Sequence, residues 1–161
     1  MFDLKAEFYL KIIFLFSFIA LISAFFIEYV LGHQPCNLCL IERIPYGLSI
    51  MIIMAIFLIK KNQKFLVLLL ILTFIFSFAI SFYHFGIEQG FFQESSVCGV
   101  KSLTESITKE DLLKQLSEKT ISCRDVTFRI FGLSLTSINI VISLLFIITL
   151  LKIFKKYEKN K

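Results

Sequence analysis

Four long runs of apolar residues, separated by polar stretches, dominate the hydropathy pattern of the chain. The runs cover residues 12–31, 44–59, 65–82 and 133–153. A helix rises ~1.5 Å per residue and needs ~20 residues to cross a ~30 Å hydrocarbon core, so the second run is short and its helix should begin earlier. We therefore predict an all-α fold, an integral membrane four-helix bundle. It forms a single domain over residues 1–161, with spans at about 12–31, 41–59, 65–83 and 133–153 and external loops at 32–40 and 84–132.

Composition supports a membrane protein, and the distribution of charge orients it. The chain is 57% hydrophobic with a mean hydropathy of +0.83, whereas soluble domains are ~45–50% apolar. Ten lysines lie in the N-terminal arm, the turn at residues 60–64 and the C-terminal tail, while the short external loop is flanked only by Arg43. By the positive-inside rule both termini are cytoplasmic, so all the cysteines lie on the opposite face.

The stretch from His33 to Arg43 reads His-Gln-Pro-Cys-Asn-Leu-Cys-Leu-Ile-Glu-Arg and contains a Cys-x-x-Cys pair, Cys36 and Cys39. The disulfide of such a pair closes a small ring that can be reduced and reoxidised. Asn37 is the expected N-cap of the second helix, and the positive end of a helix raises thiol acidity. If the helix has already begun, Arg43 shares a face with Cys39 and stabilises its thiolate.

The remaining cysteines, Cys98 and Cys123, lie in the long external loop with 24 residues between them. This spacing fits a zinc ribbon poorly, so we predict no metal site. Four cysteines confined to an oxidising compartment favour two disulfides. A purely structural role for the Cys-x-x-Cys bridge stays open, although so short a loop stabilises a fold little.

The long external loop carries seven acidic and six basic residues, which excludes a nucleic-acid surface. Residues 108–111 read as a capping box, and leucines follow at helical spacing. We predict a short amphipathic helix there, either lying in the membrane interface or packed as a lid on the bundle. At the start of this loop, His84 is a candidate for the redox site. A haem held by His84 and His33 is disfavoured because His33 is a loop residue.

Two dithiols on one face of a membrane can form an electron relay. Thiol-disulfide exchange would carry two electrons from a soluble external protein to the loop pair and then to the Cys-x-x-Cys pair. A dithiol at the lipid boundary is within reach of a lipid-soluble acceptor, and a quinone fits that place. Arg43 could hydrogen-bond a quinone carbonyl and stabilise the developing oxyanion.

Several motifs together resemble the DsbB family (disulfide bond formation protein B). They are Gln34-Pro-Cys-x-x-Cys39 followed by Glu42 and Arg43, Tyr83-His84, the two loop cysteines, and Phe131-Gly-Leu-Ser-Leu135 with Asn139. The resemblance implies a bacterial inner-membrane oxidase. Such an enzyme reoxidises a periplasmic thioredoxin-like protein (DsbA-like) and passes two electrons to ubiquinone or menaquinone.

The resemblance also implies roles for individual residues. Cys98 is attacked by the partner, Cys123 exchanges with Cys36, and Cys39 faces the quinone with Arg43; His84 is a further quinone-binding candidate. We expect resting disulfides between Cys36 and Cys39 and between Cys98 and Cys123.

Two alternatives remain at this stage. One is a non-enzymatic four-span membrane protein with two structural disulfides, which would not require an arginine four residues after Cys39. The other is a quinone-linked thiol oxidoreductase similar to vitamin K epoxide reductase. In that family the Cys-x-x-Cys motif usually lies late in the chain, whereas here it precedes the second span.

Overall fold

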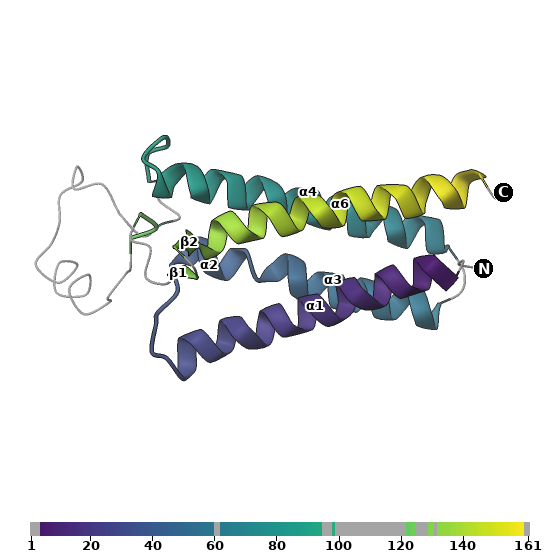
Figure 1. Cartoon of the computed structure of the whole chain (residues 1–161), viewed down its shortest axis with the longest axis horizontal. Coiled ribbons are helices and arrows are strands. Elements are labelled where there is room, and N and C mark those ends of the chain that lie inside the picture. Colours follow the sequence, from purple (N-terminus) through teal and green to yellow (C-terminus); the bar gives the residue numbers. More distant parts are fainter. Residues whose placement is uncertain are drawn as a thin grey trace, which may run out of the picture.

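A computed structural model describes residues 4–59, 62–94, 98, 122–124, 129–130 and 132–159. It contains four long apolar helical segments that are able to span a membrane, which confirms the predicted all-α bundle (Figure 1). They are α1 (Leu4–Tyr29), α2 (Asn37–Ile41) continued by α3 (Ile44–Leu58), α4 (Gln63–Glu88) and α6 (Leu135–Lys159). The short helix predicted after residue 108 lies outside the described residues.

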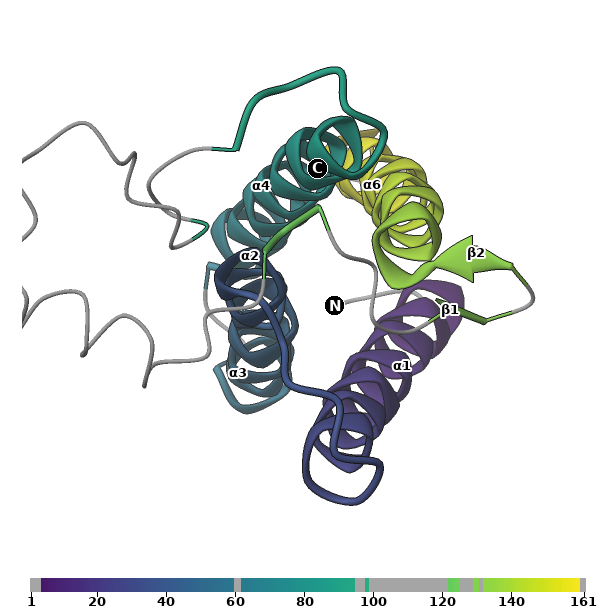
Figure 2. The ribbon, with the colours of Figure 1, turned by 90° about the vertical axis from the view of Figure 1, so that its left-hand side faces the viewer.

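The helices occupy the corners of a four-sided bundle. Viewed from the end, α3 lies beside both α1 and α4, α4 lies beside α6, and α1 is diagonal to α4 (Figure 2). Fully buried side chains from all four helices form the core, among them Leu10, Ile13, Ile53, Phe74 and Leu150. The buried residues of α1 all lie between Ala6 and Ser17. The second half of α1 is therefore less tightly covered, and the pocket described below lies along it.

The second span is broken into two helices. α2 begins at Asn37 and not near residue 41, and its N-cap is Cys36 and not Asn37 as the sequence suggested. The chain leaves the helix at Glu42 and Arg43 and re-enters it at Ile44. Pro45 lies in the first turn of α3. A proline lacks an N–H and its ring clashes with the carbonyl four residues earlier, which accounts for the break.

The end of α4 is closed by a tight C-terminal cap. Gly90 has a φ of +78°, its N–H donates to the Ile87 carbonyl at 3.0 Å, and the N–H of Phe91 donates to the Gly86 carbonyl at 2.8 Å. This is the Schellman arrangement, which favours glycine at the residue after the C-cap. Phe92 folds back over Gly86 and stacks on Tyr83, with ring centroids 5.7 Å apart. The cap thus directs the chain back over α4 before Cys98.

A short antiparallel pair of strands, which the sequence pattern did not indicate, precedes α6. β1 (Arg129–Ile130) pairs with β2 (Leu133–Ser134), with Arg129 opposite Ser134. Gly132 has a φ of +82°, as a tight turn between such strands requires.

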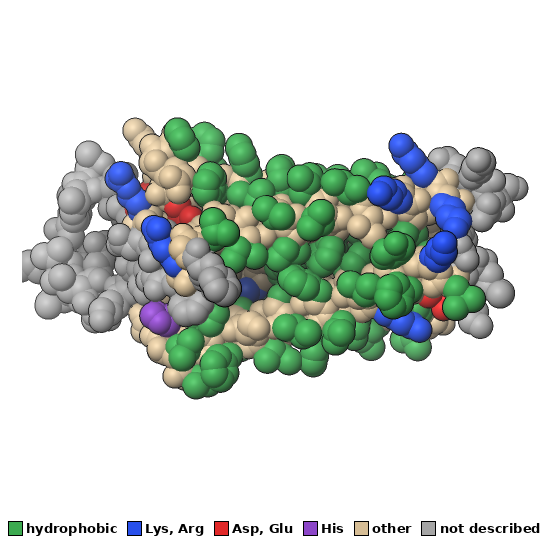
Figure 3. Space-filling view, in the orientation of Figure 1, with side chains coloured by type: hydrophobic (Ala, Val, Ile, Leu, Met, Phe, Trp, Pro, Cys, Tyr) green, Lys and Arg blue, Asp and Glu red, His purple; other side chains and the backbone are tan. Residues whose placement is uncertain are grey.

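The surface of the bundle fits a membrane. Apolar side chains cover the middle of the helices, and lysine and arginine side chains gather toward the two ends (Figure 3). The start of α1 and the end of α6 lie at one end of the bundle, and α2 and the strands lie at the other (Figure 1). The Cys-x-x-Cys pair is therefore at the end opposite to both termini.

Candidate functional site

The Cys-x-x-Cys pair forms the first turn of α2. Cys36 is the N-cap, and its sulfur accepts a hydrogen bond from the backbone N–H of Cys39 at 3.3 Å. An N-cap side chain lies over the third residue of its helix, so this spacing brings the two sulfurs together. They are 2.6 Å apart as free thiols, whereas a disulfide bond is ~2.05 Å long. A small side-chain movement, together with removal of two electrons and two protons by an oxidant, would join them.

His84 on α4 faces Cys36. Its Nε2 lies 3.6 Å from the Cys36 sulfur, and both side chains are buried. The pKa of the Cys36 thiol is lowered from 9.0, mainly by the hydrogen bond with the Cys39 side chain and also by the hydrogen bond and charge of His84, and burial opposes this shift. Cys36 therefore has the environment of a thiolate, the form that attacks disulfides and binds metals. From the sequence, the stabilised thiolate was predicted at Cys39 and not at Cys36.

Glu42 connects His84 to the fourth span. The His84 Nδ1–H donates to Glu42 Oε1 at 2.9 Å, and Asn139 Nδ2 donates to Glu42 Oε2 at 3.3 Å and to Ser81 Oγ at 2.7 Å. The Tyr46 hydroxyl donates in turn to the side-chain oxygen Oδ1 of Asn139. The break between α2 and α3 places Glu42 in this buried position. The cluster fixes the orientation of the His84 ring and ties the break between α2 and α3 to α4 and α6, since buried polar groups need such partners.

A second buried carboxylate lies one turn after His84. Glu88 Oε1 is 3.8 Å from His84 Nε2 and accepts a hydrogen bond from Thr136 Oγ1 at 2.8 Å. Glu88 Oε2 is buried and has no hydrogen-bond partner within the described part of the chain. The side chains of Glu42 and Glu88 thus bring two carboxylates to one histidine.

Arg43 turns toward α1. It forms an ion pair with Glu28, and its guanidinium lies 5.3 Å from the centre of the Phe25 ring. In the sequence, Glu28 is a single carboxylate near the end of the first apolar run. The pair is mostly buried, and such pairing fixes the orientation of a guanidinium. α1 therefore holds Arg43 in place beside the redox pair.

The loop cysteines are joined and packed against the first pair. Cys98 and Cys123 form a disulfide with Cα atoms 5.6 Å apart. Both are almost completely buried in one cluster with Cys36, Leu38 and Ile87. Glu94 accepts hydrogen bonds from the Ser122 hydroxyl and from the Arg124 N–H, which ties together the two segments that carry these cysteines. The structure thus gathers all the cysteines at one end of the bundle.

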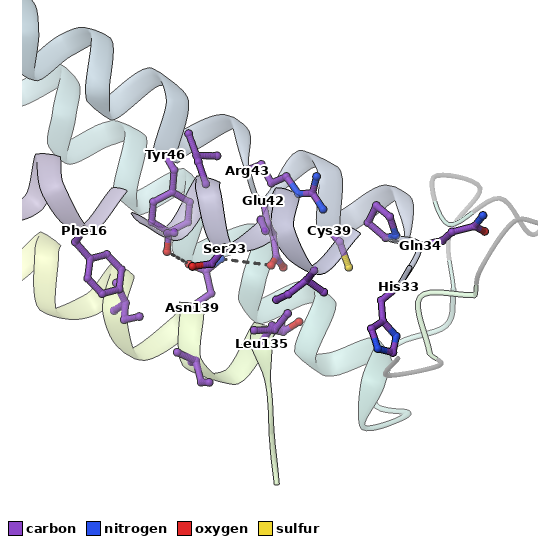
Figure 4. Close-up of a pocket in the computed structure, with 18 residues that line it drawn as sticks. Phe16, Ser23, His33, Gln34, Cys39, Glu42, Arg43, Tyr46, Leu135 and Asn139 are labelled. Carbon is purple, nitrogen blue, oxygen red and sulfur yellow. Dashed lines mark hydrogen bonds between the residues drawn. The ribbon is translucent and has the colours of Figure 1, made fainter. Parts of the chain in front are cut away.

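A pocket of about 300 Å³ opens on the other side of Cys39. It lies between the second half of α1, the chain around α2 and α3, and the start of α6 (Figure 4). Phe16 lies at one end of the pocket and His33 at the other, with Tyr46, Asn139 and Glu42 between them (Figure 4). Its wall is mostly apolar, and its polar side chains include Cys39 and Arg43. His84 is not among the lining residues.

Sequence reasoning missed the roles of Glu28, Glu42, Glu88 and Asn139. The signal for Asn139 was present, because a polar side chain inside an apolar span is costly unless it is satisfied or functional. The same signal marks Ser81, its hydrogen-bond partner. Their partners could not be read from spacing, since they come from different helices.

Comparison with known proteins places the chain in a family. The family model described as "Disulfide bond formation protein DsbB" matches residues 6–153. An uncharacterized protein of Rickettsia prowazekii (strain Madrid E) is 31% identical over 147 residues, which cover 90% of this chain and 86% of the relative. Members of this inner-membrane family are multi-pass oxidoreductases of disulfide-bond formation, as the four spans and the cysteines lead one to expect. The chain therefore belongs to the DsbB family of membrane disulfide oxidoreductases.

Proposed function

We propose that the protein is a thiol:quinone oxidoreductase that reoxidises a periplasmic DsbA-like protein. One observation carries this proposal above the others: the Cys36–Cys39 pair lies between the loop disulfide, which packs on Cys36, and an apolar pocket, which Cys39 lines. A dithiol in that position has a protein substrate on one side and room for a lipid-soluble acceptor on the other.

The proposed exchange begins at the loop disulfide. A thiolate of the reduced partner attacks Cys98, Cys123 leaves as a thiolate, and the second thiolate of the partner releases Cys98, so the partner leaves oxidised. Cys123 then attacks Cys36 in the Cys36–Cys39 disulfide, and Cys39 leaves as a thiolate. When Cys98 displaces Cys36 from Cys123, the loop disulfide is restored. Two electrons have then moved to the Cys-x-x-Cys pair.

The pocket has the features that a quinone ring requires. Its wall is apolar, it holds about 300 Å³, and the Cys39 side chain and Arg43 both line it. A bound quinone would accept two electrons and two protons from the dithiol. Arg43, oriented by Glu28, would hydrogen-bond a quinone oxygen and stabilise negative charge there. In this scheme His84 acts on Cys36 and not on the quinone, because it contacts the cysteine and does not line the pocket.

The proposal also places the protein in the membrane. With both termini cytoplasmic, the end of the bundle that holds the four cysteines faces the periplasm, as the distribution of lysines indicates. The chain acts as one membrane domain, and the pocket lies within the outer part of the bilayer, where a quinone from the lipid phase can enter.

Quinone reduction by the purified protein in detergent tests this proposal. A reduced thioredoxin-like dithiol protein supplies electrons, and wild type is compared with Cys39→Ser and with Ser49→Ala, a buried serine whose hydroxyl binds Ser17 away from the cysteines. We expect turnover in wild type and in Ser49→Ala, and none in Cys39→Ser. A folded wild-type protein that reduces no quinone with any dithiol donor would instead support a membrane protein with structural disulfides.

A further inference from the structure

We propose that the reduced Cys36–Cys39 pair and His84 form a binding site for a thiophilic divalent cation, zinc above all, and that the bound metal holds the pair in its reduced form. The ligand atoms of the three residues all lie within 4.8 Å of one another. Two thiolates and one imidazole are a ligand set that zinc prefers. The inference depends on the reducibility of this pair but requires neither a quinone nor a partner protein.

The spacing of the ligand atoms fits tetrahedral zinc. Zn–S bonds of ~2.3 Å and Zn–N bonds of ~2.0–2.1 Å at a tetrahedral angle separate a sulfur and a nitrogen ligand by ~3.5 Å. The Cys36 sulfur and His84 Nε2 are already 3.6 Å apart. The two sulfurs, 2.6 Å apart, must separate by roughly 1 Å to share the ion. Rotation of the partly exposed Cys39 side chain opens this distance without moving the backbone.

The His84 ring is fixed in the orientation that metal binding needs. Its Nδ1–H donates to Glu42 Oε1 at 2.9 Å, so Nε2, the nitrogen that faces Cys36, is the one that would give up its proton to a metal ion. Zinc-binding histidines commonly donate their other ring N–H to a carboxylate in this way, and the carboxylate fixes the tautomer and makes the ring a better ligand. Glu42 is held in turn by Asn139. The hydrogen bonds that would orient His84 as a metal ligand, from Glu42 and through it from Asn139, are therefore already present.

The charge around the three ligands also favours a cation. Glu88 lies on the Nε2 side of His84, 3.8 Å away, with its side chain only 5% exposed and one oxygen without a partner within the described part of the chain. Buried carboxylates normally find a partner, and a nearby cation is one. Arg43 is not the cationic partner of Glu88, because Arg43 is paired with Glu28 on α1. Glu88 would stabilise a bound ion by its charge and could occupy the fourth position after a side-chain rotation.

Metal binding and electron transfer would exclude each other. Both sulfurs must be thiolates to bind the ion, and the thiol protons are released while no electron moves. A disulfide between Cys36 and Cys39 removes both ligands. Zinc would thus bind only after the pair has received electrons, and it would prevent the pair from being reoxidised.

Cobalt binding to the purified protein in detergent tests the site directly. The background is Cys98→Ala/Cys123→Ala, so that reduction frees no other thiols, and no quinone or partner is present. After reduction under argon, Co²⁺ is added and its tetrahedral d–d absorption and thiolate-to-cobalt charge-transfer bands are recorded. Zn²⁺ then displaces Co²⁺ in competition with a chelating dye. We expect one equivalent of metal for the reduced protein and none for the oxidised protein.

Three variants and one control separate this site from adventitious thiol binding. His84→Ala should weaken zinc binding by about 100-fold and alter the d–d bands, and Cys36→Ser should abolish binding. Glu42→Gln should weaken binding by ~10-fold or more. His33→Ala, which removes the other histidine of the chain, should leave the affinity unchanged. Zinc should also raise the Tm of the reduced protein but not of the oxidised one, which checks that each variant is folded.

The proposal is overturned if the reduced protein gives no tetrahedral cobalt spectrum, or if His84→Ala binds zinc as tightly as its parent. Because no quinone is present, these results do not depend on the proposed oxidase activity. Failure of that activity alone would leave the metal site unaffected.

Discussion

The two cysteine pairs carry the same chemical groups in different surroundings. Cys36 and Cys39 are separated by one helical turn, and Cys36 contacts His84, behind which lies a polar cluster drawn from three helical segments. Cys98 and Cys123 are separated by 25 positions in the sequence and pack with Leu38 and Ile87. The first pair is fixed on the helical scaffold beside the pocket, and the second belongs to the long loop. In the proposed function, the first position suits a lipid-soluble acceptor and the second a protein partner.

Removal of the loop cysteines should separate the reaction with a protein partner most clearly from the reduction of the lipid-soluble acceptor. We expect Cys98→Ala/Cys123→Ala to lose at least ~100-fold of the turnover driven by a reduced thioredoxin-like protein, because removal of a reacting group costs the whole covalent route. With dithiothreitol as donor, which can reach Cys36 and Cys39 without a docking loop, the same protein should keep most of its quinone reduction. Equal losses with both donors would contradict the division of roles.

Loss of Arg43 should affect only the first pair. Arg43→Ala should lower the kcat for quinone reduction by ~10²-fold, because an oriented donor at a developing oxyanion is removed. Glu28→Gln, which leaves the arginine but removes its partner, should have a smaller effect. Both are measured with dithiothreitol as donor, so that docking of a partner plays no part.

Arg129→Ala provides the matched control for Arg43, since it removes an exposed arginine on β1 near the same end of the bundle. It should match wild type in that assay. An unchanged kcat in Arg43→Ala would contradict the proposed role of this arginine in quinone reduction.

The polar cluster behind the first pair should contribute to stability as well as to position. Asn139→Ala removes two donated and two accepted hydrogen bonds, to Glu42, Ser81, Tyr46 and Ser143. Leaving buried groups unsatisfied costs ~1–3 kcal/mol each, and relaxation of the cluster should keep the total near the upper part of that range. Denaturation in mixed detergent measures it. A change below about 0.5 kcal/mol would mean that the cluster is dispensable for folding.

Substitution of Gly86 tests the packing of the C-terminal cap of α4, and its expected effect on stability is the smallest of these. An added Cβ would lie 2.1 Å from the Phe92 ring, so Gly86→Ala should displace that ring and cost ~1 kcal/mol. Gly47→Ala is the matched control, because a Cβ there meets no other atom within 4 Å and alanine favours a helix. Thermal unfolding should therefore lower the Tm for Gly86→Ala and maintain or raise it for Gly47→Ala. A lower Tm for Gly47→Ala than for Gly86→Ala would contradict a role for Phe92 in packing on α4.

Much of the fold could be predicted because its signals are local. Membrane spans follow from the length and hydropathy of each run, and the Cys-x-x-Cys pair with Arg43 lies within eight residues. The polar arm before residue 12 was not predicted to be helical, yet α1 begins at Leu4. Lysine and glutamate are good helix formers, so a helix can extend beyond its apolar run.

The composition of the site could not be predicted, for a different physical reason. Glu42 lies within the opening motif, but its contacts with His84 and Asn139 depend on how α4 and α6 pack against α2, and no spacing along the chain gives that packing. The same holds for Arg43, which meets Glu28 on α1 because the helix breaks before Pro45. Helical spacing along the chain predicts that Arg43 lies near Cys39. It cannot predict the ion pair with Glu28, because Glu28 lies on another helix.

The assembly of the site from three separate spans has a consequence for biogenesis. A membrane protein is synthesised from its N-terminus, so α1 and α2 are made well before α4 and α6. Until α4 is inserted, Cys36 lacks His84, and until α6 follows, Glu42 lacks Asn139. In a nascent or truncated chain the pKa of Cys36 is therefore lowered by Cys39 alone; the contribution of His84 is added with α4, and the support of Asn139 for Glu42 only with the last span.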